Sequence, residues 1–384
     1  MISNGAALPA DALDAAAAAD NAVNSGLAAW LRQARRVHTA YGVSIARQAL
    51  GIISYWMRLG TRRREYYLYR LYDPAVPPTT KRTFLSNARW DDLVDRINPR
   101  AYHYLVDDKT AFGTTLRRFG IATAAIHDVF DVSRTMFLSG SGARDAAAFA
   151  RHVRSLAAPG IVIKDEEGRQ GHHVHVLQRI DDRSVLLADG RRLGHEEFFA
   201  RLTESGVRRF VVQERLRPHP DLRPLAGETL ATIRLVTYID DPGDVRALRA
   251  TMRVPLLDAG VDNFSAGNLA APIDLTTGVL GQALERETGR RHALHPRTGA
   301  PLEGFAVPDW PAVLLLVARA ALAFDRLPTI GWDVAITASG PVLVEGNSRY
   351  QLNVIQMPHG RGVWEGDFRR WCEARAGWRR GLPR

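Results

Sequence analysis

The stretch IGWDVAITASGPVLVEGNSRYQ, residues 330–351, is the part of the sequence that decides the fold. It predicts two short apolar strands joined by a tight loop. Residues that face each other across an antiparallel pair lie on the same side of the sheet. A three-residue loop, residues 338–340, makes Asp333 of the first strand face Glu345 of the second. Gly340 supplies the positive φ that the last position of such a loop requires.

This register would bring two carboxylates together, with Asn347 and Arg349 further along the same face. Crowded carboxylates repel each other unless a cation lies between them. Oxygen ligands of this kind suit Mg²⁺, which commonly completes its coordination with phosphate oxygens. The hairpin alone is equally compatible with solvated acids on an exposed face, so the rest of the chain must decide between the two interpretations.

The composition is that of a globular protein. At 384 residues, with 46% hydrophobic and 24% charged residues, the chain can form two or three domains and is not expected to be disordered. Its single cysteine, Cys372, excludes an intramolecular disulfide. The first arginine is Arg32, so no basic segment precedes an apolar one as in a secretory signal. We therefore expect a cytoplasmic protein without a transmembrane segment.

Arginine greatly outnumbers lysine among the basic residues. Of the 51 lysines and arginines, only Lys81, Lys109 and Lys164 are lysines. Because arginine serves in this chain wherever a generic positive charge is enough, a retained lysine indicates a position that needs a compact ammonium. The net charge of +10 would also suit a nucleic-acid or membrane-surface protein without catalysis. We expect no specific nucleic-acid binding, since the arginines are dispersed and are not interleaved with aromatics along a groove.

Four segments follow one another along the chain. Residues 1–25 are rich in alanine and lack aromatics, which predicts a disordered tail. Residues 26–80 show helical periodicity and predict an N-terminal helical module. This module could pack on the rest of the protein, bind a partner or contact a membrane surface, and packing is the interpretation we favour. Residues 81–215 and 216–384 contain the strands of a smaller and a larger lobe.

A second group of candidate binding residues lies in the smaller lobe. A buried strand, residues 160–164, ends in Lys164, and a glycine-containing loop, residues 167–171, leads to the next strand. An ammonium at a strand end and the exposed N–H groups of a glycine loop both bind anions, so this order predicts a flap over a polyphosphate. No GKS or GKT follows the glycines, and no HRD or DFG is present, which excludes a P-loop and a protein kinase. Lys109 lies near the start of a predicted helix.

This order of parts resembles the ATP-grasp superfamily over roughly residues 107–351. The segment EGNSRYQ, residues 345–351, is similar to the E-x-N-x-R-x-Q segment of biotin carboxylase. More narrowly, the sequence resembles the sugar-transfer-associated ATP-grasp family in EYYLYRLYD, in PHP ahead of ATIR, in DNF with AG, in GWDVAI and in GPVLVEGN. The resemblance implies an α+β ATP-grasp fold in which two α/β lobes clamp ATP behind the N-terminal helices. Residues 81–215 would hold a pre-grasp segment and the small lobe with the flap, and residues 216–384 the large lobe with the metal site.

The resemblance also implies nucleotide ligands. Lys109 and Lys164 would bind the α- and β-phosphates of ATP, and Gln213, Glu214 and Leu216 would form the hinge that holds adenine and ribose. Two of the three lysines singled out by the arginine bias, Lys109 and Lys164, fall on these positions. The flap departs from the family, since Lys164 is followed by three acids where many relatives have proline and further glycines.

For the reaction centre, the resemblance implies that Asp333, Glu345 and Asn347 hold Mg²⁺, with two ions expected. Arg234 and Arg349 would act with Lys164 as catalytic residues that steady the transferred phosphoryl group and the acyl oxygens.

Two further residues, His219 and Asn268, are candidates for the acceptor site, with turn chemistry as the alternative. Three histidines, residues 172, 173 and 175, could suggest zinc. No cysteine or further histidine stands at ligand spacing, so flap or core packing is favoured.

The implied activity is that of an ATP-dependent ligase, which activates a small carboxylate as an acyl phosphate and joins it to an amine or another nucleophile. The family's name suggests a setting in saccharide or cell-surface metabolism. A kinase on the same fold, which phosphorylates a hydroxyl, is the alternative enzyme.

Overall fold

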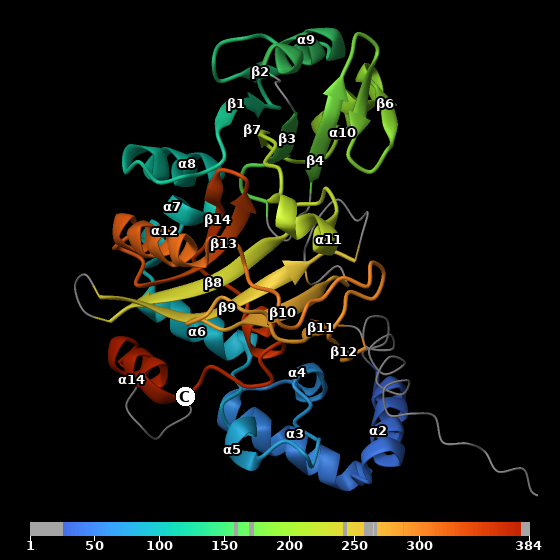
Figure 1. Cartoon of the computed structure of the whole chain (residues 1–384), viewed down its shortest axis with the longest axis vertical. Coiled ribbons are helices and arrows are strands. Elements are labelled where there is room, and N and C mark those ends of the chain that lie inside the picture. The colour runs from blue at the N-terminus through green and yellow to red at the C-terminus, as the bar shows by residue number, and fades with distance from the viewer. Residues whose placement is uncertain are drawn as a thin grey trace, which may run out of the picture.

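The computed structural model describes residues 26–156, 160–168, 173–240, 244–256, 264, 267–286 and 288–377. The predicted tail and most of the glycine loop lie outside these ranges. Figure 1 shows a small lobe at one end, a large lobe in the middle and a set of N-terminal helices at the other end. Among the described residues, no helix is long and apolar enough to cross a membrane.

The small lobe is a seven-stranded antiparallel sheet in the order β2-β1-β7-β3-β4-β5-β6. Its core is formed by apolar side chains of the sheet and of two helices, for example Phe130, Phe149 and Phe198. The strands and helices are β1 Ile126–Asp131, β2 Met136–Phe137, α9 Ala146–Leu156, β3 Ile161–Asp165, β4 Val174–Ile180, β5 Ser184–Leu187, β6 Arg192–Gly194, α10 His195–Thr203 and β7 Arg209–Glu214.

The large lobe is a second seven-stranded antiparallel sheet, in the order β12-β11-β10-β9-β8-β13-β14. Its strands are β8 Thr232–Ile239, β9 Val245–Val254, β10 Leu269–Ile273, β11 Ala283–Glu285, β12 Arg291–His292, β13 Thr329–Thr337 and β14 Gly340–Asn347. Side chains alternate between the two faces: Ile233 and Leu235 of β8 pack in the core with helix α12, Trp310–Ala323. Val236 and Tyr238 face the opposite core.

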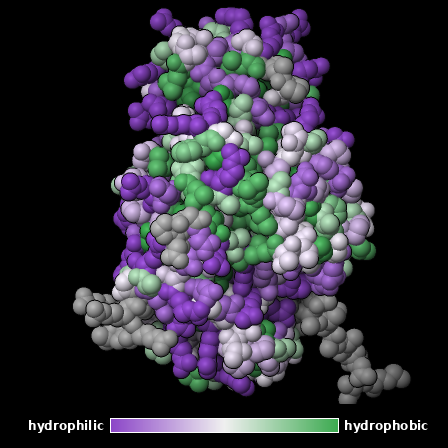
Figure 2. Space-filling model, turned by 60° about the vertical axis from the view of Figure 1, so that its left-hand side comes forward, coloured by the Kyte–Doolittle hydropathy of each residue, from purple (hydrophilic) through white to green (hydrophobic). Residues whose placement is uncertain are grey.

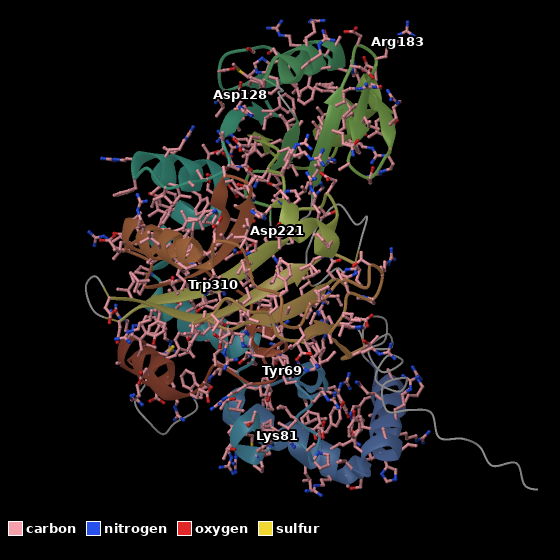
Figure 3. The ribbon with its side chains drawn as sticks, viewed as in Figure 1. Tyr69, Lys81, Asp128, Arg183, Asp221 and Trp310 are labelled. Carbon is pink, nitrogen blue, oxygen red and sulfur yellow. The ribbon has the colours of Figure 1, made fainter. Side chains whose placement is uncertain are left out.

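That opposite core joins the large lobe to the N-terminal helices. It contains Tyr66, Tyr67 and Tyr69 together with Trp90 and Tyr350, residues far apart in the sequence. Tyr69 stacks on Phe84 with the ring centroids 4.9 Å apart, and it lies where the helices meet the lobe (Figure 3). The helices on this side of the sheet are α2 Leu27–Tyr41, α3 Ile45–Leu59, α4 Arg63–Leu68, α5 Pro78–Lys81, α6 Asn87–Ile97, α13 Asn353–Gln356 and α14 Gly366–Arg375.

A short series of helices links these layers to the small lobe: η1 Arg100–Tyr102, α7 Tyr104–Asp107 and α8 Lys109–Arg118. Asp108 caps α8 by accepting a hydrogen bond from the N–H of Ala111, so Lys109 is the first residue of the helix, as the sequence predicts. A Cβ on Gly346 of β14 would approach Phe112 and Val106 to 3.0 Å, which shows how closely this helix series packs against the hairpin. Two further short helices, η2 Pro220–Leu222 and α11 Arg223–Ala226, follow the small lobe.

The hairpin differs from its prediction in one respect. Thr337 pairs with Gly340, so the loop has two residues instead of three, and Gly340, at φ +108°, is the first residue of β14. A two-residue loop would by itself set Asp333 opposite Val344. A β-bulge between Asp333 and Val334 leaves Val344 unpaired, and Asp333 therefore faces Glu345 after all. The predicted pairing is confirmed, and the predicted loop is wrong.

Candidate active site

A cavity of about 540 Å³ lies between the two lobes. Its walls come from β3, β4 and the end of β7 on one side and from β8, β13 and β14 on the other. Figure 2 shows apolar side chains gathered in the middle of the molecule, below a largely hydrophilic small lobe. Ten residues predicted from the sequence line the cavity: Lys109, Lys164, Gln213, Glu214, Leu216, Arg234, Asp333, Glu345, Asn347 and Arg349.

Sheet register brings the charged residues of the large lobe into one row. Arg234 of β8 pairs with Asp333 of β13, which pairs with Glu345 of β14. Paired residues lie on the same face of a sheet, so these three side chains project together toward the cavity. Asn347 lies two residues beyond Glu345 and therefore on the same face. The hairpin thus forms the cavity floor.

Asp333 is held by two arginines. Its carboxylate accepts hydrogen bonds from Arg234 Nε at 2.6 Å and Nη2 at 3.2 Å, and Arg253 Nη2 lies 2.9 Å away. Burial raises the pKa of Asp333, but the two guanidiniums outweigh burial and the resulting pKa lies below its usual value. Arg253 is itself positioned by Thr232, whose hydroxyl accepts a hydrogen bond from Arg253 Nε at 2.9 Å. Asp333 therefore stays ionised and fixes both guanidiniums at the cavity floor.

The donor atoms of Glu345 and Asn347 fit a hard cation. Asn347 Nδ2 donates to the carbonyl of Gly331 at 3.2 Å, which leaves the amide oxygen as the coordinating group. The Glu345 carboxylate lies close enough to Lys164 to raise its pKa, so it faces the cavity. Asp333 is a less favourable metal ligand, because it would have to share its carboxylate between the metal and two arginines. Among the described residues, no group of three or more His, Cys, Asp or Glu side chains could hold a metal.

The two lysines face this floor. Lys109 and Lys164 are both buried, at 6% and 7% exposure, and Lys109 lies close enough to Lys164 to act on its charge. Burial and the neighbouring ammonium of Lys109 lower the pKa of Lys164 to about 8, while Glu345 and Asp333 oppose this change. Two ammonium groups brought together in a buried cavity repel each other, so the cavity favours an anionic ligand that lies between them.

Lys109 also fastens the base of the flap. Its Nζ donates to the carbonyls of Glu166 at 3.3 Å and of Gly168 at 2.7 Å. The Glu166 carboxylate is buried, accepts a hydrogen bond from Thr110 Oγ1 at 2.6 Å and lies 3.7 Å from Arg209 Nη1. The acidic residue that departs from the family pattern therefore ties the end of β3 to the start of α8.

The hinge residues are held by backbone contacts at the end of β7. Gln213 Nε2 donates to the carbonyl of Ala124 at 3.0 Å, and Glu214 exchanges hydrogen bonds with Ala125 through its own N–H and carboxylate. Leu216 lines the cavity, as do four other apolar side chains, namely Val162, Val174, Val176 and Val344. An apolar slot beside a polar hinge can hold a flat heteroaromatic ring.

The remaining candidates differ in their surroundings. Arg349 lines the cavity and forms an ion pair with Asp95 of α6 at 3.0 Å. His219 does not line it: its Nδ1 accepts a hydrogen bond from the N–H of Asp221, and Figure 3 marks Asp221 near the junction of the lobes. Asn268 does not line it either, and its Oδ1 accepts a hydrogen bond from the N–H of Leu256. These contacts are those of turn and loop positions.

One histidine of the flap strand packs against aromatic rings. His175 meets the ring of Phe198 edge-on at 5.4 Å, and burial, followed by His173, lowers its pKa to about 4. His173 is exposed, and His172 lies outside the described residues. The half-buried His175 agrees with the packing interpretation.

Several cavity residues were not singled out from the sequence. Arg253 is the most important, because it completes the clamp on Asp333. Strand pairing was the available signal: Arg234 pairs with Thr251, and Arg253 lies two residues further along the same face of β9. The loop at residues 226–230 and three residues beyond the floor, namely Asn87, Asp91 and Asn353, also line the cavity. No sequence signal indicated that these residues line the cavity.

Two antiparallel lobes that enclose buried lysines on one side and a carboxylate-bearing hairpin on the other define a protein of the ATP-grasp class. The chain belongs to the sugar-transfer associated ATP-grasp family, whose family model matches residues 88–367. No curated protein shows a significant match.

Solved structures of the same fold class are distant. Biotin carboxylase of Campylobacter jejuni, solved as a β,γ-ATP complex, is 13% identical, with a TM-score of 0.42 over 75% of this chain and 50% of that one. D-alanine–D-alanine ligase of Bacillus anthracis is 11% identical, with a TM-score of 0.36 over 67% and 61%. An L-amino acid ligase of Bacillus licheniformis is 12% identical, with a TM-score of 0.36 over 77% and 47%. The chain matches about half the length of the biotin carboxylase and the L-amino acid ligase.

Proposed function

We propose that this protein is an ATP-dependent ligase that activates a small carboxylate as an acyl phosphate and joins it to an amine or another nucleophile. The observation that carries the proposal is the single cavity in which Lys109 and Lys164 oppose Glu345 and Asn347. Buried ammonium groups on one side and hard oxygen donors on the other suit a polyphosphate bound with a divalent cation.

In this proposal each group of residues has a separate task. The two lysines bind phosphate oxygens of ATP, while Gln213, Glu214 and Leu216 form the hinge beside the base. Glu345 and Asn347 would hold Mg²⁺, with Asp333 sharing its carboxylate, and two ions are expected as in the family. Mg²⁺, when bound, would neutralise charge on the phosphate oxygens.

The first chemical step forms the acyl phosphate. An oxygen of the substrate carboxylate attacks the γ-phosphorus of ATP, the bond to the bridging oxygen breaks, and ADP leaves with the electron pair. Arg234 and Arg253 are fixed at the cavity floor by Asp333, and Arg349 lies further along the same hairpin. Guanidinium groups held in advance stabilise charge that develops on the phosphoryl and acyl oxygens. Lys164 contributes a further positive charge.

The second step consumes the acyl phosphate. The lone pair of the nucleophile attacks the acyl carbon, the bond to phosphate breaks, and inorganic phosphate leaves. An attacking amine then loses a proton to water. Positioning and charge neutralisation account for both steps, so this proposal assigns no residue the role of general base.

Hydroxylamine trapping tests the proposal. The protein with ATP, Mg²⁺ and pools of small carboxylates, including uronic and amino acids suggested by the family's link to sugar transfer, should form a hydroxamate and ADP. Lys164→Met should form neither, whereas Leu315→Gln, an exposed change on α12, should behave as wild type. Phosphorylation of a hydroxyl compound without hydroxamate would indicate a kinase instead. The proposal assigns the enzyme to the cytoplasm, where ATP is available.

A further inference from the structure

Helix α3 carries a stripe of exposed apolar side chains. Leu50, Ile53, Trp56 and Met57 are 68%, 50%, 61% and 65% exposed. Leu50, Ile53 and Met57 follow the three-and-four spacing of one helix face, and Trp56 borders it. Scattered single apolar residues on a surface are ordinary, but four large ones on one face of one helix form a contiguous patch. We call these four residues the α3 stripe.

The opposite face of α3 is fixed in the protein, so the stripe points outward. Gln48 is fully buried, and its Nε2 donates to the carbonyls of Ala34 at 2.9 Å and Val43 at 2.8 Å. Its Oε1 accepts a hydrogen bond from the hydroxyl of Tyr67 at 2.9 Å. A Cβ on Gly51 would lie 2.7 Å from the hydroxyl of Tyr66, so the helix and the tyrosine are in close contact. Rotation of α3 to bury the stripe would break these buried hydrogen bonds.

The segment that contains this helix is strongly basic. Residues 27–73 contain nine arginines, at positions 32, 35, 36, 47, 58, 62, 63, 64 and 70, and two acids, Glu65 and Asp73, of which Asp73 pairs with Arg70 at 3.0 Å. Nine minus two gives a net charge of +7 for this segment, against +10 for the whole chain. Arg47 and Arg58 are exposed on α3 itself. The stripe therefore shares its helix with exposed positive charge, in a segment where arginines far outnumber acids.

The stripe also lies far from the cavity. Figure 1 shows α3 at the end of the molecule opposite the small lobe, with the large lobe between them. A flat surface that contacts α3 would therefore leave the mouth of the cavity and the small lobe unobstructed.

We propose that α3 docks on an anionic lipid bilayer, with the stripe in the interface between headgroups and acyl chains and the arginines on acidic headgroups. An apolar helix face bordered by tryptophan and flanked by arginine is typical of an interfacial helix. Acidic lipids attract such a basic segment, and the cytoplasmic leaflet is rich in them. This proposal rests on the surface of α3 and does not depend on the reaction in the cavity.

Two other occupants fit less well. A second copy of the chain, docked through the same face, would bring two segments of net charge +7 together. A nucleic acid would match the charge, but it offers no hydrocarbon to cover Leu50, Ile53 and Met57.

Vesicle co-sedimentation of the full-length protein tests the proposal. The wild type should bind vesicles of phosphatidylcholine with phosphatidylserine, bind phosphatidylcholine alone at least about tenfold more weakly, and dissociate as salt is raised. Leu50→Gln with Met57→Gln should weaken binding by at least about tenfold, because two apolar side chains no longer partition into the interface. A matched change of two exposed leucines on α12, Leu315→Gln with Leu322→Gln, should leave binding unchanged.

A second variant keeps the test decisive if the first is poorly folded. Arg47→Gln with Arg58→Gln leaves the stripe intact and should reduce the preference for phosphatidylserine. Circular dichroism and ADP formation should stay at wild-type levels in both variants, since neither touches the cavity. Failure of the wild type to bind acidic vesicles, or equal binding by the Leu50/Met57 variant, would overturn the proposal. A dimer that dissociates on mutation of the stripe, without vesicle binding, would assign the face to a second copy instead.

Discussion

Lys164 shows how burial and charge set the properties of a single residue in the cavity. Its ammonium is almost completely buried beside Lys109, and its pKa is lowered to about 8. In the unfolded chain a lysine has a pKa of 10.5, so between about pH 8 and 10.5 the unfolded state binds more protons than the folded state. The contribution of Lys164 to stability therefore rises with pH across this window. At neutral pH the nucleotide-free protein holds an unfavourable charge that an anion would relieve.

We predict that ATP affinity falls as the pH rises above about 8. Deprotonation of Lys164 removes the charge that a phosphate oxygen would contact, so affinity should fall by up to about tenfold per pH unit. Lys164→Met should bind ATP roughly 10- to 100-fold more weakly at pH 7, since bonds to charged groups contribute about 1.5–3 kcal/mol. Titration calorimetry across the pH range measures both effects. A pH dependence that is unchanged in Lys164→Met would show that another group titrates.

A second prediction separates Asp333 from Glu345. Asp333→Asn leaves Arg234 and Arg253 buried without their shared counter-charge, so it should reduce the free energy of unfolding by about 3–5 kcal/mol. Glu345→Gln should lower the magnesium-dependent response to ATP with less than about 1 kcal/mol of lost stability, because its carboxylate is only half-buried. Thermal unfolding with and without ATP and Mg²⁺ measures the difference. Equal destabilisation by the two changes would contradict the clamp on Asp333.

At the level of elements, the hairpin shows what strand patterns can and cannot predict. The facing of Asp333 and Glu345 and the positive φ of Gly340 are both confirmed. The predicted loop length is wrong, because the loop has two residues and a bulge at Val344 makes up for the missing third. The bulge shifts the alternation of faces by one residue, so that Leu343 packs in the core while Glu345, two residues on, lines the cavity. A three-residue loop and a two-residue loop with a bulge therefore give the same facing pair, and the sequence alone allows both.

The flap base gives a prediction at this scale. Glu166→Ala removes the buried acceptor of Thr110 and the neighbour of Arg209, which should cost about 1–3 kcal/mol. Amide hydrogen exchange at residues 165–168 and at the start of α8 should become faster, and the KM for ATP should rise. Glu167→Ala is the matched control, because Glu167 is the exposed acid next to it. The same exchange rates in both variants would show that Glu166 does not fasten the flap.

At the scale of the whole molecule, the sequence predicts the two lobes and their order better than the contacts between them. Local periodicity was enough for β3, β13 and β14, since each is a strongly patterned segment. It could not predict that Lys109 would hold two flap carbonyls, or that Arg253 would join Arg234 on Asp333. These contacts depend on how distant elements pack, which no local pattern encodes. The same limit applies to the core shared by the N-terminal helices and the large lobe.

That shared core predicts coupling between the helices and the cavity. Tyr69 stacks on Phe84, and its hydroxyl donates to Oδ1 of Asn353, a residue that lines the cavity. Tyr69→Ala should lower the free energy of unfolding by about 3–5 kcal/mol and weaken ATP binding, since it removes a buried ring beside the cavity wall. Tyr69→Phe keeps the ring and should cost only about 1 kcal/mol. Chemical denaturation of the two variants measures the difference, and similar losses would indicate that the hydroxyl matters more than the ring.

The proposed function requires that the cavity between the lobes binds ATP with Mg²⁺ through the lysines of one side and the hairpin of the other. Titration calorimetry of the full-length protein with ATP, in the presence and absence of Mg²⁺, measures this binding. We expect one saturable site per chain that is strengthened by Mg²⁺, weakened in Lys164→Met under both conditions, and insensitive to Mg²⁺ in Glu345→Gln with Asn347→Ala. Absence of ATP binding by the wild type, or binding unchanged in both variants, would rule out this site.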